Sequence, residues 1–202
     1  AISLQYSESF FNNTICTYNF SPDKGGCLSV SASARPTIDN MIFSHNIAHG
    51  PGGGMYCLDN SSAVVTNSYF TYNEAQQGGA FFTEFGIDGS VHNCSMMYNY
   101  ALMGGAMYNK GASIVFTSLK MYNNFALSAG GGMVFVLNVP YPNATTPATL
   151  FLDTFISENH ATHLGGGIYI LPSTTFSYSK TNATLFSNTQ LIGNSARYGG
   201  GV

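Results

Sequence analysis

The chain has no tryptophan and few charged residues. Asp, Glu, Lys and Arg make up 7% of its 202 residues, whereas an average soluble domain has about 25%. Six Lys and Arg side chains are too few for the basic surface that binds nucleic acid. A disordered chain would carry more charge and fewer aromatic residues than the 14% present here. These shortages predict a folded protein that does not bind nucleic acid.

Long hydrophobic runs are missing as well. No stretch reaches the about 18 apolar residues of a membrane-spanning helix, so we expect no membrane span in this segment. No basic segment followed by a short apolar run marks a signal peptide, so we interpret the sequence as a mature or trimmed piece. What the chain has instead is 23 Gly and 19 Asn, a mixture that favours tight turns and an all-β fold.

A repeat runs through the whole sequence. Gly pairs recur at intervals of 25 to 35 residues and end at Gly26, Gly54, Gly79, Gly105, Gly132, Gly167 and Gly201. Ahead of each pair, an Asn is followed two positions later by a small residue. These seven Asn, which we expect to form a structural ladder, are Asn19, Asn46, Asn73, Asn99, Asn124, Asn159 and Asn194. When this Asn is position zero, the register from −8 to +2 holds in seven copies without a gap.

Three other positions of the repeat have a constant character. Positions −8 and −3 are apolar in every copy, from Phe11 and Cys16 in the first to Phe186 and Leu191 in the last. Such columns point inwards in a stack of short strands. Position −6 is short and polar throughout and is Asn in five copies. Because Asn tolerates a left-handed backbone, we expect one corner at −6, a second at the zero Asn and a third at the Gly pair.

These features predict a parallel β-helix. Gly and Asn interrupt each copy too often for helices, and the pieces between them, such as 113–116, are short runs of strand-forming residues. We expect three strands and three corners per coil, and about seven right-handed coils of 25–35 residues in one all-β domain spanning 1–202. Bare coil ends are sheet edges, so we expect a fragment of a longer solenoid. A β-propeller blade, the alternative, needs about 40–45 residues.

The repeat resembles a known family. Segments 43–46 and 70–73 have the form FxxN, and segments 78–81 and 104–107 have the form GGA followed by a hydrophobic residue. Over about residues 10–202, this alternation resembles the tandem repeat of chlamydial polymorphic outer membrane proteins (Pmp), whose passenger domains are right-handed β-helices. Phe occupies −3 in two of the seven copies, and the residues that stand where Ala is expected are Met55, Met133 and Ile168. The resemblance implies a cell-surface or secreted protein acting in adhesion or as a stalk, and it implies no catalytic residue.

The acidic residues are too scattered to predict catalysis. Enzymes that process polysaccharides need clustered carboxylates or a calcium site, but the long arcs at 133–148 and 168–183 contain no Asp or Glu. We therefore expect no enzyme activity, no catalytic residue and no cofactor, with a polysaccharide-processing enzyme as an alternative. Glu158, His160 and His163 could supply three metal ligands, but we interpret them as polar turn residues and predict no metal site.

Two further sets of residues are candidates for contact with other molecules. The position before the zero Asn is a ring in four consecutive copies: Tyr18, His45, Tyr72 and Tyr98. Outward rings could stack on a sugar or a partner protein, which would suit a polysaccharide-binding module, or they could merely stack on one another. If the source is eukaryotic, we expect N-linked glycans at the sequons of Asn143, Asn182, Asn60 and Asn12, in falling order. The sequons of Asn19 and Asn93 are left out because they lie in ladder columns.

The cysteines suggest an oxidising compartment without deciding it. Cys16 and Cys27 fall on the same turn and could pair, or they could be buried hydrophobic residues. Cys57 and Cys94 lie in unrelated columns and should not pair. We expect a non-enzymatic extracellular or cell-surface protein with a structural or adhesive role, such as a stalk or filament component. Its expected partners are further coils or copies of itself end to end, and a cell-surface glycan or protein.

Overall fold

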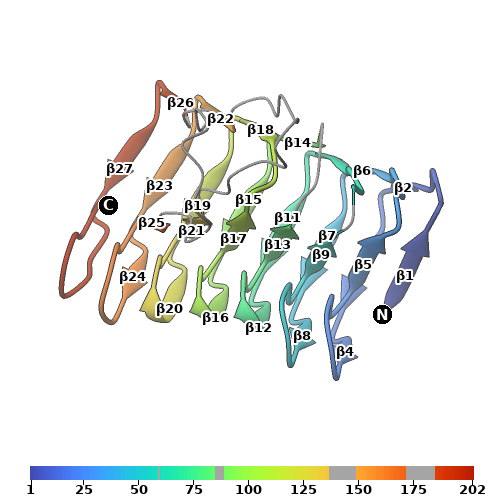
Figure 1. Cartoon of the computed structure of the whole chain (residues 1–202), viewed down its shortest axis with the longest axis horizontal. Coiled ribbons are helices and arrows are strands. Elements are labelled where there is room, and N and C mark those ends of the chain that lie inside the picture. Colours follow the sequence, from blue (N-terminus) through green and yellow to red (C-terminus); the bar gives the residue numbers. More distant parts are fainter. Residues whose placement is uncertain (59, 85–88, 137–148, 172–184) are drawn as a thin grey trace, which may run out of the picture.

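The computed structural model describes residues 1–58, 60–84, 89–136, 149–171 and 185–202. Over these residues the chain is all-β, with short parallel strands and no helix. The strands wind into coils that stack along one axis, and the two termini lie at opposite ends of the stack (Figure 1). Three sheets have seven strands each and a fourth has six. The predicted parallel β-helix is therefore confirmed.

The coils form four sheets, one more than the sequence predicted, and the last coil has no strand in the fourth. Sheet A contains β1 (Ile2–Gln5), β5 (Leu28–Ser31), β9 (Met55–Cys57), β13 (Phe81–Glu84), β17 (Met107–Lys110), β21 (Met133–Val136) and β25 (Ile168–Leu171). Sheet B contains β2 (Phe10–Asn12), β6 (Thr37–Asp39), β10 (Val64–Thr66), β14 (Gly89–His92), β18 (Ile114–Thr117), β22 (Leu150–Leu152) and β26 (Leu185–Ser187). Sheet C contains β3 (Ile15–Thr17), β7 (Ile42–Ser44), β11 (Tyr69–Thr71), β15 (Ser95–Met97), β19 (Lys120–Tyr122), β23 (Phe155–Ser157) and β27 (Gln190–Ile192). Sheet D contains β4 (Phe20–Ser21), β8 (Ile47–Ala48), β12 (Glu74–Gln77), β16 (Tyr100–Met103), β20 (Phe125–Ala129) and β24 (His160–Ala161).

Sheet D occupies the stretch after the zero Asn that we expected to be only a corner. In β16 the burial alternates along the strand, with Tyr100 and Leu102 exposed on either side of the buried Ala101. This alternation with a period of two is the signature of a strand with one face in the core. The small residue at +2 is therefore an inward strand residue, and the expectation of three strands per coil is wrong.

The core is built from the predicted inward columns. Phe43 and Phe70 at position −3 stack with their ring centroids 4.3 Å apart, and Phe116 and Phe151 at −8 stack at 4.7 Å. All four side chains are fully buried. The ends of the columns are the exceptions: Phe11 and Phe186 are half-buried, and 37% of the surface of Leu191 in the last coil is exposed.

The corners are only partly where the sequence placed them. Position −6 is left-handed in every copy, with φ between 50° and 54°, as predicted. At the second corner, the left-handed residue is the one before the zero Asn, not the Asn itself: Tyr18, His45, Tyr72, Tyr98, Asn123, Glu158 and Gly193. The zero Asn follows this bend, and its backbone N–H and side chain bond to the zero Asn of the next coil. That part of the prediction is wrong.

The glycine register also differs from the sequence alignment. Strand pairing places Met55 opposite Phe81 and Met133 opposite Met107. Gly54 and Gly132 therefore occupy the column of Ala80 and Ala106. The expectation that Met55, Met133 and Ile168 stand in the place of this Ala is wrong. The left-handed Gly is the first of each pair or triplet, as at Gly52 and Gly78. The middle Gly of the triplets is needed for close stacking, since a Cβ on Gly131 would lie 2.5 Å from backbone atoms of His160.

Candidate functional site

The predicted asparagine ladder exists and is the most continuous feature of the molecule. Asn73 donates its backbone N–H to Asn99 Oδ1 at 2.9 Å and its side-chain Nδ2 to the same oxygen at 3.0 Å. The same Nδ2 also donates to the Phe43 carbonyl of the previous coil at 2.9 Å. Equivalent bonds between side chains join the zero Asn of successive coils from Asn19 to Asn194. The five inner members are buried, so the ladder satisfies polar groups inside the stack.

A second, exposed ladder of side-chain hydrogen bonds follows position −6 in part of the stack. Asn93 Nδ2 donates to Asn67 Oδ1 at 2.8 Å, and Asn67 Nδ2 donates at 2.8 Å to Oδ1 of Asp39, which is at −7 in the previous coil. In this ladder the later coil donates to the earlier one, whereas the zero Asn donates to the later coil. Hydrogen bonds from Thr66 and Asn67 lower the pKa of the Asp39 carboxyl, because they stabilise its ionised form.

The four rings before the zero Asn form one outward stack. The centroid distances are 4.7 Å from Tyr18 to His45, 5.0 Å from His45 to Tyr72 and 5.1 Å from Tyr72 to Tyr98, with ring planes within 20°. The facing surfaces of these rings therefore cover one another. Sugars bind aromatic residues through the ring face, so the stack offers a sugar the outer face of Tyr18 and otherwise ring edges. The geometry favours the second of the two interpretations, mutual stacking.

An open groove lies on the outer face of sheet A near β1 and was not anticipated from the sequence. It has a volume of about 420 Å³ and is lined by Ser3, Ser29, Ser31, Lys24 and Tyr56, among others. Lys24 Nζ lies 5.0 Å from the centroid of the Tyr56 ring and donates a hydrogen bond to its hydroxyl at 3.4 Å. Asp23 also lines the groove, which thus combines hydroxyl groups with one ammonium and one carboxylate group, while the Tyr56 ring beneath Lys24 is buried. In the sequence, only the Ser residues at alternating positions of a strand, such as Ser29 and Ser31, indicated a polar outer face at the place of this groove.

The Tyr56 ring belongs to a second hydrophobic cluster outside the main core. Tyr56, Phe82, Tyr108 and Val134 are buried on the other side of sheet A from the core residues. Their rings continue from coil to coil, with centroids 5.3 Å apart between Tyr56 and Phe82 and 5.4 Å apart between Phe82 and Tyr108. Burial raises the pKa of the Tyr108 hydroxyl. The sequence did not predict this row, because its residues follow the Gly pairs and lie outside the −8 to +2 register of the repeat.

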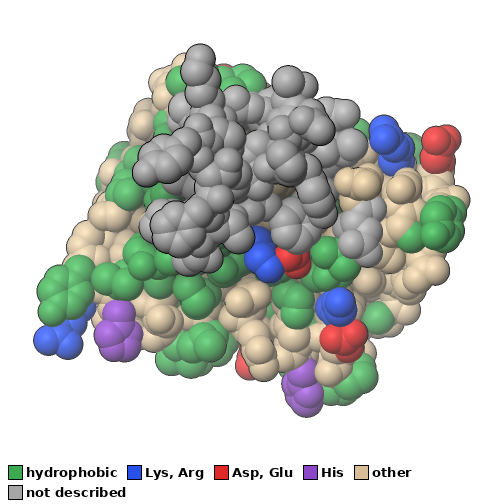
Figure 2. Space-filling view, viewed as in Figure 1, with side chains coloured by type: hydrophobic (Ala, Val, Ile, Leu, Met, Phe, Trp, Pro, Cys, Tyr) green, Lys and Arg blue, Asp and Glu red, His purple; other side chains and the backbone are tan. Residues whose placement is uncertain are grey.

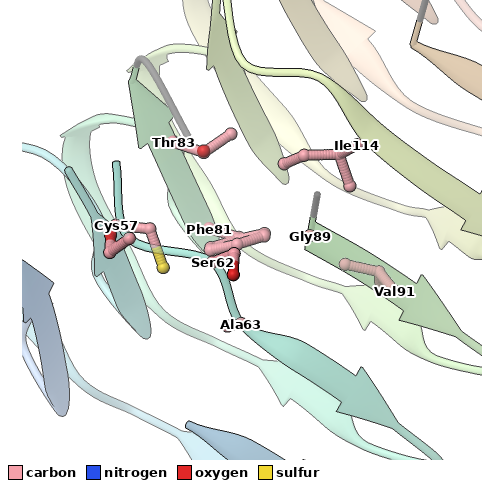
Figure 3. A pocket seen from close by; sticks show the side chains of 9 residues that line it. Cys57, Ser62, Ala63, Phe81, Thr83, Gly89, Val91 and Ile114 are labelled. Carbon is pink, nitrogen blue, oxygen red and sulfur yellow. The ribbon is translucent and has the colours of Figure 1, made fainter. Parts of the chain in front are cut away.

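A small internal cavity lies between sheets A and B. Cys57, Ser62, Phe81, Thr83, Val91 and Ile114 are among the residues that line it (Figure 3). Its volume of about 10 Å³ is that of one water molecule and far below the size of an organic ligand. It is therefore a packing defect of the core and not a substrate site.

The residues considered as metal ligands do not converge. His160 stacks on Phe125 at 5.2 Å and its Nδ1 is hydrogen-bonded to Ser195 Oγ at 2.8 Å. Glu158 lies at the preceding corner with a left-handed backbone, over Gly193. Among the residues that the structure describes, no group of three His, Cys, Asp or Glu side chains could hold a metal ion.

Charged side chains are isolated on the surface. Figure 2 shows Lys, Arg, Asp and Glu as single residues or mixed pairs among hydrophobic and neutral side chains. Lys110 and Glu84 on neighbouring strands of sheet A form an ion pair with a nitrogen–oxygen distance of 2.5 Å. The face shown carries no continuous patch of one sign outside the grey residues.

Two of the four predicted glycan acceptors fall within the described residues. Asn60 and Asn12 are both exposed, which agrees with their expected outward placement. Asn143 and Asn182 lie outside the described residues, as does most of each long arc. Asn93 is also exposed, so its place in the −6 ladder does not bury it. Its Nδ2 is engaged with Asn67.

The cysteines divide into one disulfide and two buried thiols. Cys16 in β3 and Cys27 before β5 form a disulfide with a Cα–Cα distance of 6.1 Å, so the pairing that the sequence left open is present. Cys57 and Cys94 are free and buried, as expected. Burial raises the pKa of the Cys94 thiol to about 11 and raises that of Cys57 further.

Comparisons with known proteins give two similar sequences. No protein-family model and no solved structure matches the chain. The metabotropic glutamate receptor-like protein R of Dictyostelium discoideum is 29% identical over 133 residues, which cover 65% of this chain and 8% of that protein. The metabotropic glutamate receptor-like protein Q of the same organism is 32% identical over 111 residues, which cover 54% of this chain and 9% of that protein. The chain thus matches less than a tenth of either relative. No helix in the described part of the chain is long and apolar enough to cross a membrane.

Proposed function

We propose that this segment is a non-enzymatic β-solenoid module of a cell-surface protein, and that it acts extracellularly as a stiff stalk or adhesive spacer. The observation that carries the proposal is the buried ladder of zero Asn residues, which is bonded without interruption through every coil. Bending the stack would open buried amide hydrogen bonds, each of which costs about 1–3 kcal/mol when left unpaired. A rod of this kind is suited to hold other parts of a protein at a fixed distance.

Three observations support the extracellular part of the proposal. The Cys16–Cys27 disulfide is typical of proteins that fold in an oxidising compartment. The sequons of Asn12 and Asn60 are exposed, as glycan acceptors must be. The two similar proteins are named receptor-like, which suits a cell surface. On this proposal the partners are neighbouring coils or copies of the same solenoid and a glycan or protein at the cell surface.

The proposal is tested on cells that make the full-length protein. An antibody raised against residues 1–202 is applied before and after permeabilisation, and glycosidase treatment is followed by gel electrophoresis. We expect staining of intact cells and a faster-migrating band after glycosidase. Staining that needs permeabilisation, together with unchanged migration, would overturn the extracellular assignment.

A second candidate function is the binding of a neutral saccharide in the groove beside β1. The groove on sheet A provides the hydroxyl groups of Ser29 and Ser31, the Asp23 carboxylate and the Lys24 ammonium, over a Tyr56 ring that is 3% exposed. Converging polar groups of this kind are typical of small-ligand sites. The test is a glycan array with the wild type, Lys24→Ala, and Tyr72→Ala as the control on the outward ring stack. Loss of a signal in Lys24→Ala alone supports the groove, and loss in Tyr72→Ala alone supports the ring stack.

A further inference from the structure

Two tyrosines of the outward stack lie face to face at the molecular surface. The ring centroids of Tyr72 and Tyr98 are 5.1 Å apart and their planes differ by 9°. The exposed fractions of the two side chains are 52% and 44%. Both residues occupy the same left-handed corner in adjacent coils, with φ of 55° and 57°. The fold therefore holds two phenol rings in contact while leaving both open to solvent.

No other pair of described tyrosines combines these properties. His45 separates Tyr18 from Tyr72, at 4.7 Å and 5.0 Å from the two rings. Tyr122 meets Tyr98 edge-on, at 6.3 Å and an interplanar angle of 73°, and its hydroxyl donates to Met97 Sδ. Tyr6 is the most exposed of the described tyrosines, at 83%. It has no ring partner within the residues that the structure describes.

We propose that Tyr72 and Tyr98 are a site of oxidative cross-linking, where a peroxidase-type oxidant couples them to dityrosine. Hydrogen peroxide takes one hydrogen atom, an electron with its proton, from each phenol hydroxyl and becomes two water molecules. Each phenoxyl radical has unpaired density on the carbons ortho to the oxygen, and two such carbons form one carbon–carbon bond. The hydrogens on these carbons then move to the oxygens and restore both phenols. The product has two hydrogen atoms fewer than the starting chain.

The cross-link would clamp the third coil to the fourth. Parallel strands of neighbouring coils are about 4.8 Å apart, which keeps the two rings side by side, and both rings must rotate out of their stack for the ortho carbons to bond. The chain has no tryptophan to compete as a radical sink, and the free thiols of Cys57 and Cys94 are buried, which leaves tyrosine and methionine as the main exposed oxidation targets. Given an oxidant, the coupling depends on the geometry of the Tyr72–Tyr98 pair and not on the proposed function. The proposed extracellular location affects only the source of the oxidant.

The experiment treats the purified chain at low micromolar concentration with horseradish peroxidase and equimolar hydrogen peroxide. We expect a monomer that is two hydrogen atoms lighter, shows dityrosine fluorescence and yields a cross-linked peptide joining Tyr72 to Tyr98. The variants Tyr72→Phe and Tyr98→Phe should lose this peptide and most of the monomer fluorescence. The matched control Tyr6→Phe removes the most exposed tyrosine and should leave both unchanged.

Two controls keep the result decisive. Circular dichroism shows whether each Phe variant retains the wild-type fold, and wild-type protein in denaturant should lose the preference for the Tyr72–Tyr98 link. The cross-linked wild type should also unfold at a higher temperature than the untreated chain. Coupling through Tyr6 into dimers, an unchanged monomer product in Tyr98→Phe, or methionine oxidation without dityrosine would each overturn the proposal.

Discussion

At the scale of single residues, the zero Asn does more than fill a corner. The Asn99 side chain accepts two hydrogen bonds from Asn73 and donates to Asn124 Oδ1 and the Phe70 carbonyl. Replacement by Ala would leave several of these buried groups unpaired, at about 1–3 kcal/mol each. We expect Asn99→Ala to lower the free energy of unfolding by roughly 3 kcal/mol or more, measured by urea denaturation.

The matched control for this change is Asn12→Ala. Asn12 is exposed and does not have a left-handed backbone, so its replacement should change the free energy of unfolding by less than about 0.5 kcal/mol. Equal effects of the two substitutions would show that the ladder does not stabilise the stack.

Glycine 79 is needed for close approach of two coils. A Cβ at Gly79 would lie 2.6 Å from the Tyr100 carbonyl oxygen and even closer to that of Gly105. Both neighbours are backbone atoms, so relief requires the coils to separate. We expect Gly79→Ala to prevent folding or to lower the unfolding temperature by more than about 10 °C. Gly89→Ala is the comparison, because its nearest backbone neighbour, the Ala63 carbonyl oxygen, is 3.4 Å away. Similar melting curves for the two variants would contradict this account.

The buried thiols predict how stability depends on alkaline pH. Unfolded thiols titrate near pH 8.5, whereas Cys94 in the folded chain has a pKa of about 11 and that of Cys57 is raised further. The folded state holds these protons more tightly, so stability is unaffected below about pH 8.5 and falls as the pH rises towards 11. Each thiol contributes up to about 1.4 kcal/mol per pH unit in this window. Urea unfolding of the wild type from pH 8 to 10.5 should therefore be steeper in pH than that of the double variant Cys57→Ala/Cys94→Ala. Parallel pH profiles would refute the assignment.

At the scale of the elements, the sequence predicts the core better than the corners. Inward columns were evident because apolar residues recur at −8 and −3, and burial confirms them at Ile38 and Phe43. The fourth sheet was missed because its strands are as short as two residues, as in β8, and a run of that length has no readable alternation. The left-handed position was misplaced because Asn is the usual left-handed residue, whereas here Tyr and His adopt that backbone and Asn provides the side-chain bonds.

The disulfide joins two elements of the first turn. It links Cys16 to Cys27 across a separation of 11 residues, for which loop closure predicts about 2–3 kcal/mol of stabilisation. We expect the double variant Cys16→Ala/Cys27→Ala to be less stable by this amount in urea. Adding a reductant should destabilise the wild type but leave the double variant unchanged. Sensitivity of the double variant to reductant would mean that another disulfide forms in solution.

At the scale of the whole molecule, strand pairing within the described residues joins each coil to its neighbours. The pairs connect successive coils, such as β11 with β7 and β15, so stability should be a sum of local terms. We expect Asn99→Ala to raise amide hydrogen exchange most in residues 73–124 and less around Cys16 and Cys27. Exchange measured by mass spectrometry tests this directly. A uniform rise along the chain would indicate global cooperative unfolding instead.

The surface features depend on the whole molecule and were the least predictable. The sequence indicated an outward line of rings, but whether their faces cover one another depends on the centroid spacing between coils, which is 5.0 Å from His45 to Tyr72. The groove needs Ser29 and Ser31 on one strand, Tyr56 on the next and Lys24 from a turn to meet. These residues do not share one position of the repeat, so comparing equivalent positions in successive copies could not reveal the groove.

The two amide ladders run in opposite senses, and this has a consequence for the electrical properties of a long solenoid. Zero Asn residues donate towards the C-terminal end, as from Asn73 to Asn99, whereas −6 residues donate towards the N-terminal end, as from Asn93 to Asn67. The side-chain dipoles of the two rows therefore oppose each other along the axis. In an α-helix the peptide dipoles are aligned and add up, which leaves partial charges at the two helix ends. A coil that has Asn at both positions, as at Asn93 and Asn99, contributes two opposed amides. Added coils of this type can lengthen the rod without these side chains building up charge at its tips.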